Sequence, residues 1–161
     1  MSEADAAAVH THPAEVRGLL RFFAGTVVLE HNAQFSSWRR LASKRDTTSS
    51  MLLEVQMFLQ EESGHIIDMC RTVGCAMPAD FAGLSKLSSI PMGSETEHKL
   101  LCARFRDDHR QMVDDARFLL AVAPVIELSS YTDVMNAQIE AHHAWSTRWD
   151  AAADDSEHPL V

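Results

Sequence analysis

The strongest constraint on this chain is a set of four long stretches in which apolar residues recur with helical spacing. They cover residues 13–44, 47–73, 95–123 and 131–153 of a 161-residue sequence. When each stretch is wound at about 100° per residue, one side becomes apolar and the other polar. In the first stretch, Val16, Phe23 and Trp38 fall on the apolar side. The pattern predicts an all-α protein built from four amphipathic helices.

The connections between these stretches predict how the helices are arranged. Those near 45–48 and 124–130 are short, which favours antiparallel neighbours. The connection over 74–93 is long and contains a Leu/Ser-rich segment, which predicts a short extra helix there. Ser94 and Glu97 have capping-box spacing at the start of the third stretch. We therefore expect an antiparallel four-helix bundle over residues 13–153, with flexible tails at 1–12 and 154–161.

Charge and cysteine usage narrow the classes of partner and location. The net charge is −9, so phosphate backbones and anionic membrane surfaces would repel the chain. No apolar run approaches the roughly 18 residues that a membrane span requires, and the first residues do not read as an export signal. The 3 cysteines cannot all pair, which favours reduced thiols. We expect a cytoplasmic protein that binds neither nucleic acid nor membrane.

Polar side chains interrupt the apolar side of every helix near its middle. In a bundle of similar-length helices these interruptions would share one level. The residues are Glu30, His31, Glu62, His65, Asp108, His109 and His142. Buried carboxylates cost several kcal/mol each unless protons or metal ions compensate them. Carboxylate and imidazole ligands suit iron, manganese or zinc, and di-iron carboxylate proteins place such ligands on facing bundle helices. We therefore predict a metal site at this level, with His31 outside the ligand shell.

Two Glu-x-x-His motifs bear on the same site. Glu62 and His65 form one, and Glu140 and His143 form the other. Glu140 falls nearly opposite the apolar side of the last helix, so periodicity favours His142 as the inward group. The Glu140/His143 pair stays open as the alternative.

The second half of the chain resembles a known family. Gly74 is followed by Met77-Pro78, then by Leu84-Ser-Lys-Leu, then by Asp108-His109, and finally by a single histidine, His142. This order resembles the domain-of-unknown-function family labelled "predicted outer membrane protein", within the ferritin-like superfamily. The resemblance covers roughly residues 16–150 and is clearest from about residue 70 onward. It implies a ferritin-like bundle with Asp108, His109 and His142 as site residues.

Two functions from different classes follow from this pattern. The first is a ferritin-like metal-binding protein that holds iron or manganese, as one ion or a pair, with zinc as a further option. As an enzyme it would be a non-haem oxidoreductase acting with oxygen or peroxide. The alternative is a non-catalytic bundle that acts by binding or in stress, whose polar level is a hydrogen-bonded network that sets helix register. A homodimer, a protein partner and a small-molecule substrate all stay open.

Overall fold

The computed structural model describes residues 14–40, 47–122 and 132–154. Four long helices and one short helix occupy this part of the chain: α2 (Ala14–Arg40), α3 (Thr47–Thr72), α4 (Phe81–Leu87), α5 (His98–Val122) and α6 (Thr132–Asp154). The predicted all-α bundle is confirmed, and so is the extra helix in the long connection. Apart from Asp154, which ends α6, the predicted tails lie outside the described residues.

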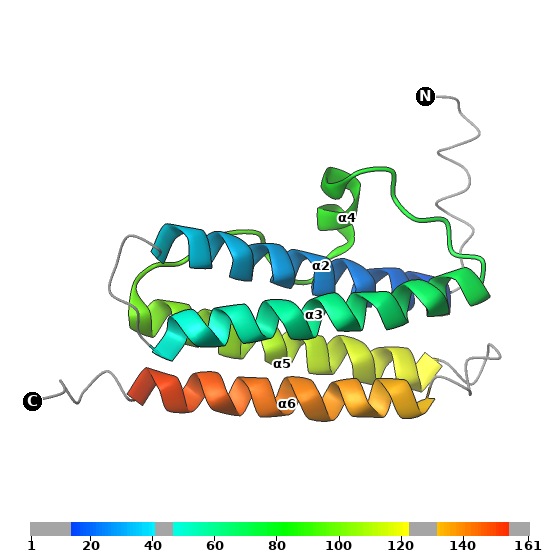
Figure 1. Cartoon of the computed structure of the whole chain (residues 1–161). Coiled ribbons are helices and arrows are strands. Elements are labelled where there is room, and N and C mark those ends of the chain that lie inside the picture. Colours follow the sequence, from blue (N-terminus) through cyan, green and yellow to red (C-terminus); the bar gives the residue numbers. More distant parts are fainter. Residues whose placement is uncertain (1–13, 41–46, 123–131, 155–161) are drawn as a thin grey trace, which may run out of the picture.

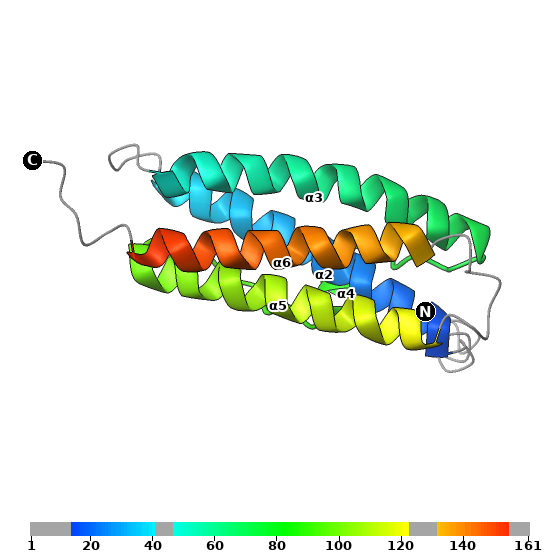
Figure 2. The same cartoon turned by 90° about the horizontal axis from the view of Figure 1, so that it is seen from below.

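The helices form two antiparallel hairpins that pack against each other (Figure 1). The hairpin of α2 and α3 lies on the hairpin of α5 and α6, and α4 stands on the outer side of α2. The connection from α3 to α5 returns along the length of the bundle, so these two helices run in the same direction (Figure 2). Each helix is therefore antiparallel to the neighbours on which it packs, as in bundles with one long crossover.

The core lies between the two hairpins and is rich in aromatic rings. Phe22 of α2, Phe105 of α5 and Trp149 of α6 are among its largest buried side chains. The rings of Phe105 and Trp149 stack with centroids 5.0 Å apart. A Cβ placed on Gly25 would lie 2.7 Å from the sulfur of Met112. Helices α2 and α5 thus approach closely at Gly25.

The second half of α2 presents a polar stripe to the bundle. Asn32, Ser36 and Arg40 are buried at helical spacing of four residues. They bind the backbone of the returning connection. The Asn32 amide donates to the Pro91 carbonyl at 3.0 Å, and the Arg40 guanidinium donates to the Thr96 carbonyl at 2.6 Å. These bonds hold the connection along α2 and give each of the three buried side chains at least one hydrogen bond.

This polar stripe explains one error of the sequence analysis. Trp38 was predicted to lie on the apolar side of α2, but it is 54% exposed and packs beside Phe35, with ring centroids 5.2 Å apart. The sequence analysis located the inward face of each helix from its apolar residues. In the second half of α2 the inward face is polar, because its side chains bind the backbone of the returning connection.

The start of α5 also differs from the prediction. The helix begins at His98, and the carboxylate of Glu97 accepts the backbone N–H of Leu100 at 2.8 Å. Glu97 therefore caps the helix, rather than Ser94. The Ser94 hydroxyl instead accepts a hydrogen bond from Arg39 at 2.7 Å.

Candidate functional site

A buried carboxylate and two buried histidines meet in the core. Glu62 belongs to α3, His109 to α5 and His142 to α6, and all three side chains are enclosed. Each lies on the inward face of its helix, among apolar neighbours one turn away such as Leu59 and Ile66 on α3. Helix phase alone therefore brings them inward.

The three side chains form a linear chain of hydrogen bonds. Nε2 of His142 lies 2.9 Å from Oε1 of Glu62. Nδ1 of His142 lies 2.7 Å from Nδ1 of His109. His142 is thus the middle member, and both of its ring nitrogens have protein partners. Oε2 of Glu62 and Nε2 of His109 are buried without a hydrogen-bond partner.

The contact between the two Nδ1 atoms constrains the protons. One ring must donate and the other must accept. If His109 is neutral and accepts at Nδ1, it carries its proton on Nε2. If it instead donates from Nδ1, its Nε2 has a free lone pair.

The apolar surroundings of the three hydrogen-bonded side chains favour a neutral His109. Burial lowers the pKa of His109 well below its ordinary value, and the nearby His142 lowers it further. Its ring stacks on Trp145 at 5.9 Å. The rings of Phe22 and Phe58 lie in edge-to-face arrangements with His142, with ring centroids 6.2 and 5.4 Å away. These rings surround the imidazoles with apolar surface.

Asp108 directly precedes His109 in the sequence and is also buried, but its carboxylate lies beside Arg104. Its Oδ2 lies 3.6 Å from Nε of Arg104, and burial raises its pKa to about 7, with Arg104 opposing the shift. The Arg104 guanidinium also donates to the Pro91 carbonyl at 2.7 Å. Arg104 therefore joins Asp108 to the returning connection.

The remaining predicted site residues of α2 and α3 lie outside the core. Glu30 is half-buried and accepts a hydrogen bond from Gln60 at 3.0 Å. His65 is exposed. His31 is half-buried and packs between Phe35 and Phe81, at ring distances of 4.4 and 4.7 Å. The structure does not bring these three side chains to the buried chain.

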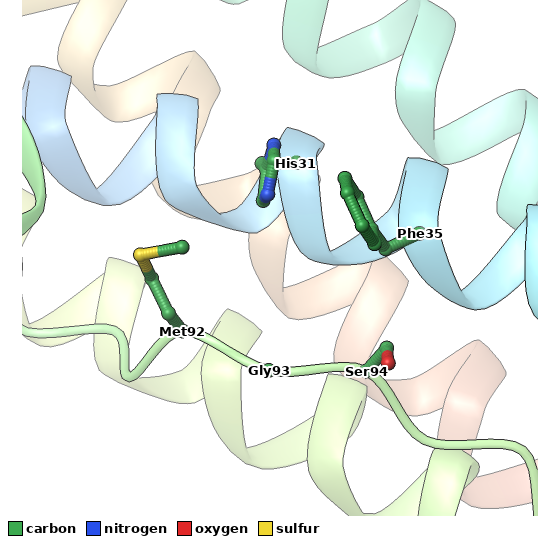
Figure 3. Close-up of a pocket in the computed structure, with 5 residues that line it drawn as sticks. All are labelled: His31, Phe35, Met92, Gly93 and Ser94. Atoms are coloured by element: carbon green, nitrogen blue, oxygen red, sulfur yellow. The ribbon is translucent and has the colours of Figure 1, made fainter. Parts of the chain in front are cut away.

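His31 lines an open pocket on the surface of α2 (Figure 3). The other lining residues are Phe35, Met92, Gly93 and Ser94. In the figure, the thioether of Met92 and the rings of His31 and Phe35 border the same space. His31 is the one titratable side chain among the lining residues, so the pocket offers no acid–base pair.

The second Glu-x-x-His motif lies on the outer face of α6. Glu140 and His143 are both exposed, whereas His142 is fully buried. Arg117 donates a hydrogen bond to Nε2 of His143 at 3.1 Å. The inward group of α6 is therefore His142, as periodicity favoured.

Several buried polar residues were not predicted as interior groups, and Asn32, Asp115 and Gln138 are examples. Asn32 binds the returning connection, as described above. Asp115 accepts from Gln111 at 3.2 Å, from Ser89, and from Arg21, whose nitrogen lies 3.2 Å away. Gln138 precedes His142 by one turn. Asn32 and Gln138 lie on the inward faces of their helices together with apolar residues. That position in the sequence pattern could have predicted their burial.

The donor set does not fit a dinuclear metal centre. Such centres take carboxylates from all four helices and two histidines. Among the side chains whose burial is described, α2 sends no carboxylate into the core and α3 sends only Glu62. Across residues 14–40, 47–122 and 132–154, no group of three or more His, Cys, Asp or Glu side chains is placed to hold a metal ion.

Comparison with known proteins defines the fold. No protein-family model matches the chain, and no curated protein matches it. Among solved structures, it is similar to a Dps protein from Vibrio cholerae O1, described as a member of a broad superfamily of ferritin-like diiron-carboxylate proteins. The TM-score is 0.74 at 14% identity, over 85% of this chain and 87% of that chain. The chain therefore has the ferritin-like fold. The resemblance to the "predicted outer membrane protein" family stays a prediction.

None of the described helices combines the length and the apolar character that crossing a bilayer needs.

Proposed function

We propose that this protein is a non-catalytic ferritin-like bundle that acts by binding, and that the chain of Glu62, His142 and His109 is a structural layer. The observation that supports this is the use of both His142 ring nitrogens, at 2.9 and 2.7 Å, by side chains from two other helices. One residue of helix slip displaces a side chain by about 1.5 Å along the axis. Such a slip would break both hydrogen bonds, so the chain favours one register of α3, α5 and α6.

The burial of Glu62, His142 and His109 argues against catalysis by these three side chains. All three side chains are buried, and a catalytic group must come within hydrogen-bond reach of a substrate. We propose that the outer surface of the bundle binds a second copy of this chain or another protein.

A second candidate function is the binding of a single metal ion. Oε2 of Glu62 and Nε2 of His109 are ligand-type atoms that are buried without partners, and the Vibrio cholerae neighbour is described as a diiron-carboxylate protein. In this case Glu62 and His109 would have to move together to share one iron, manganese or zinc ion, because their partnerless atoms lie at opposite ends of the linear chain of hydrogen bonds. Both candidates use the same residues, so one experiment separates them.

Metal content and metal-dependent stability test the proposal. Untagged protein, purified without added metal, is analysed for metals and then unfolded thermally with and without Fe²⁺, Mn²⁺ or Zn²⁺. We expect less than one equivalent of any metal and no metal-dependent shift in Tm. The variants are His109→Gln and, as a matched exposed control, His65→Gln. One equivalent bound by the wild type and by His65→Gln, but lost in His109→Gln, would overturn the structural proposal and establish the metal site.

A further inference from the structure

The end of α3 has a specific backbone geometry. Gly74 has a φ of +69°, and two hydrogen bonds close the turn. The N–H of Cys75 donates to the carbonyl of Cys70 at 2.8 Å, and the N–H of Gly74 donates to the carbonyl of Arg71 at 3.2 Å. This pair of bonds around a left-handed glycine is the Schellman motif, which commonly packs the side chain after the glycine against the last turn of the helix.

In this chain the two side chains that the motif brings together are both thiols. The backbone bond from Cys75 to Cys70 closes the turn, and the Cys75 side chain packs against the core cluster that contains Cys70. Cys70 is buried, and Cys75 is half-buried. The two positions that usually hold an apolar contact in this motif are therefore occupied by thiols.

We propose that Cys70 and Cys75 form an oxidisable dithiol that closes to an intramolecular disulfide when the protein meets a peroxide. The inference is independent of the core chain and of the proposed function.

The reaction balances in two steps. The Cys75 thiolate attacks one oxygen of hydrogen peroxide, the O–O bond breaks, and the departing oxygen leaves as water after protonation, which gives a sulfenic acid on Cys75. The Cys70 thiolate then attacks the Cys75 sulfur, the S–O bond breaks, and the hydroxide leaves as a second water. Two thiols and one peroxide thus become one disulfide and two waters. The two sulfurs lose two electrons, and the peroxide oxygens gain them.

Accessibility sets the order of these steps and their pace. Cys75 is the half-buried member and meets the oxidant first. Burial raises the pKa of both thiols, that of Cys70 to about 12. Because the thiolate is the nucleophile, oxidation is slow at neutral pH. The dithiol therefore responds to sustained rather than brief exposure.

Cys102 supplies a matched control within the same chain. It is fully buried on α5, and its sulfur lies 3.9 Å from Nε2 of His98. It is a buried thiol like Cys70, but it is not part of the Schellman turn that joins Cys70 and Cys75. Oxidation to a disulfide should spare it.

The test counts thiols in the full-length folded protein. Reduced protein is exposed to hydrogen peroxide, the peroxide is removed, and free thiols are alkylated after denaturation. Intact mass and peptide mapping then locate the products. We expect the wild type and Cys102→Ala to lose the Cys70 and Cys75 thiols together, with a mass lower by two hydrogen atoms before alkylation. A reductant should restore both thiols.

The variant Cys75→Ser removes the half-buried member with little disturbance of the core. It should form no intramolecular disulfide, and its Cys70 should stay alkylatable. The proposal fails if wild-type Cys70 and Cys75 remain free after exposure that oxidises a model dithiol. It also fails if the products are oxygen adducts, disulfides through Cys102, or disulfides between two chains.

Discussion

Nδ1 of His109 and Nδ1 of His142 lie 2.7 Å apart in the core, and the opposite nitrogen of His142 lies 2.9 Å from Glu62. One imidazole therefore connects a carboxylate on α3 to a second imidazole on α5. The stability and pH response of the protein should depend on this connection.

Loss of Glu62 should destabilise the bundle strongly. Glu62→Ala leaves His142 without its buried partner, and breaking a buried pair costs about 3 to 5 kcal/mol. Glu62→Gln keeps an oxygen that accepts from Nε2 and should cost less. Urea unfolding at pH 7 measures both. Glu54→Gln is the control, because Glu54 pairs with Arg148 between the same two helices at 2.7 Å but is exposed; it should cost no more than about 1 kcal/mol.

Removal of His109 should change the acid response. Burial lowers its folded-state pKa below the unfolded value, so the unfolded state binds the proton first as pH falls. The contribution of His109 is thus present above about pH 6.5 and is lost below it, by up to about 1.4 kcal/mol per pH unit. In His109→Phe, the slope of unfolding free energy against pH should be flatter below about pH 6.5. An unchanged slope, or an equal change in the exposed variant His65→Gln, would contradict this assignment.

Asp108 should act in the opposite direction. Its folded-state pKa is raised to about 7 by burial, so the folded state binds the proton more tightly and stability falls as pH rises between about 4 and 7. Asp108→Asn imitates the neutral form. At pH 8 we expect it to be more stable than the wild type by about 2 to 4 kcal/mol, with the difference nearly gone at pH 4. Denaturant unfolding at the two pH values tests this. Equal differences at both values would show that ionisation is not the cause.

Two glycines should respond in opposite ways to alanine. At Gly25 the new methyl group would meet the sulfur of buried Met112 at 2.7 Å, whereas at Gly64 no atom lies within 4 Å. Gly25→Ala should therefore destabilise the protein by about 1 to 3 kcal/mol through overpacking. Gly64→Ala should stabilise it by about 0.5 to 1 kcal/mol through helix propensity. Thermal unfolding of the pair provides the comparison, and a stabilised Gly25→Ala would show that Met112 moves aside without cost.

Part of the candidate site could be predicted, because the position of a residue around its helix axis indicates whether its side chain is buried. Glu62 and His142 lie among apolar residues at helical spacing, and both are enclosed. Glu30 and His65 lie near the edges of their stripes, where a small rotation of the helix decides between core and solvent. In the structure Glu30 is half-buried and His65 is exposed. Neither hydrogen bond to His142 was predictable, because each joins residues far apart in the sequence.

By itself the sequence determined four long helices, most of their inward-facing apolar residues and the extra helix in the long connection, because helical periodicity and chain breaks are local properties. The tertiary structure alone decided which polar side chains meet. It joined Glu62, His142 and His109, left His31 beside a surface pocket, and used Asn32 to bind the returning connection. These outcomes depend on the axial offset and rotation of packed helices, and residue spacing within one helix does not encode either quantity.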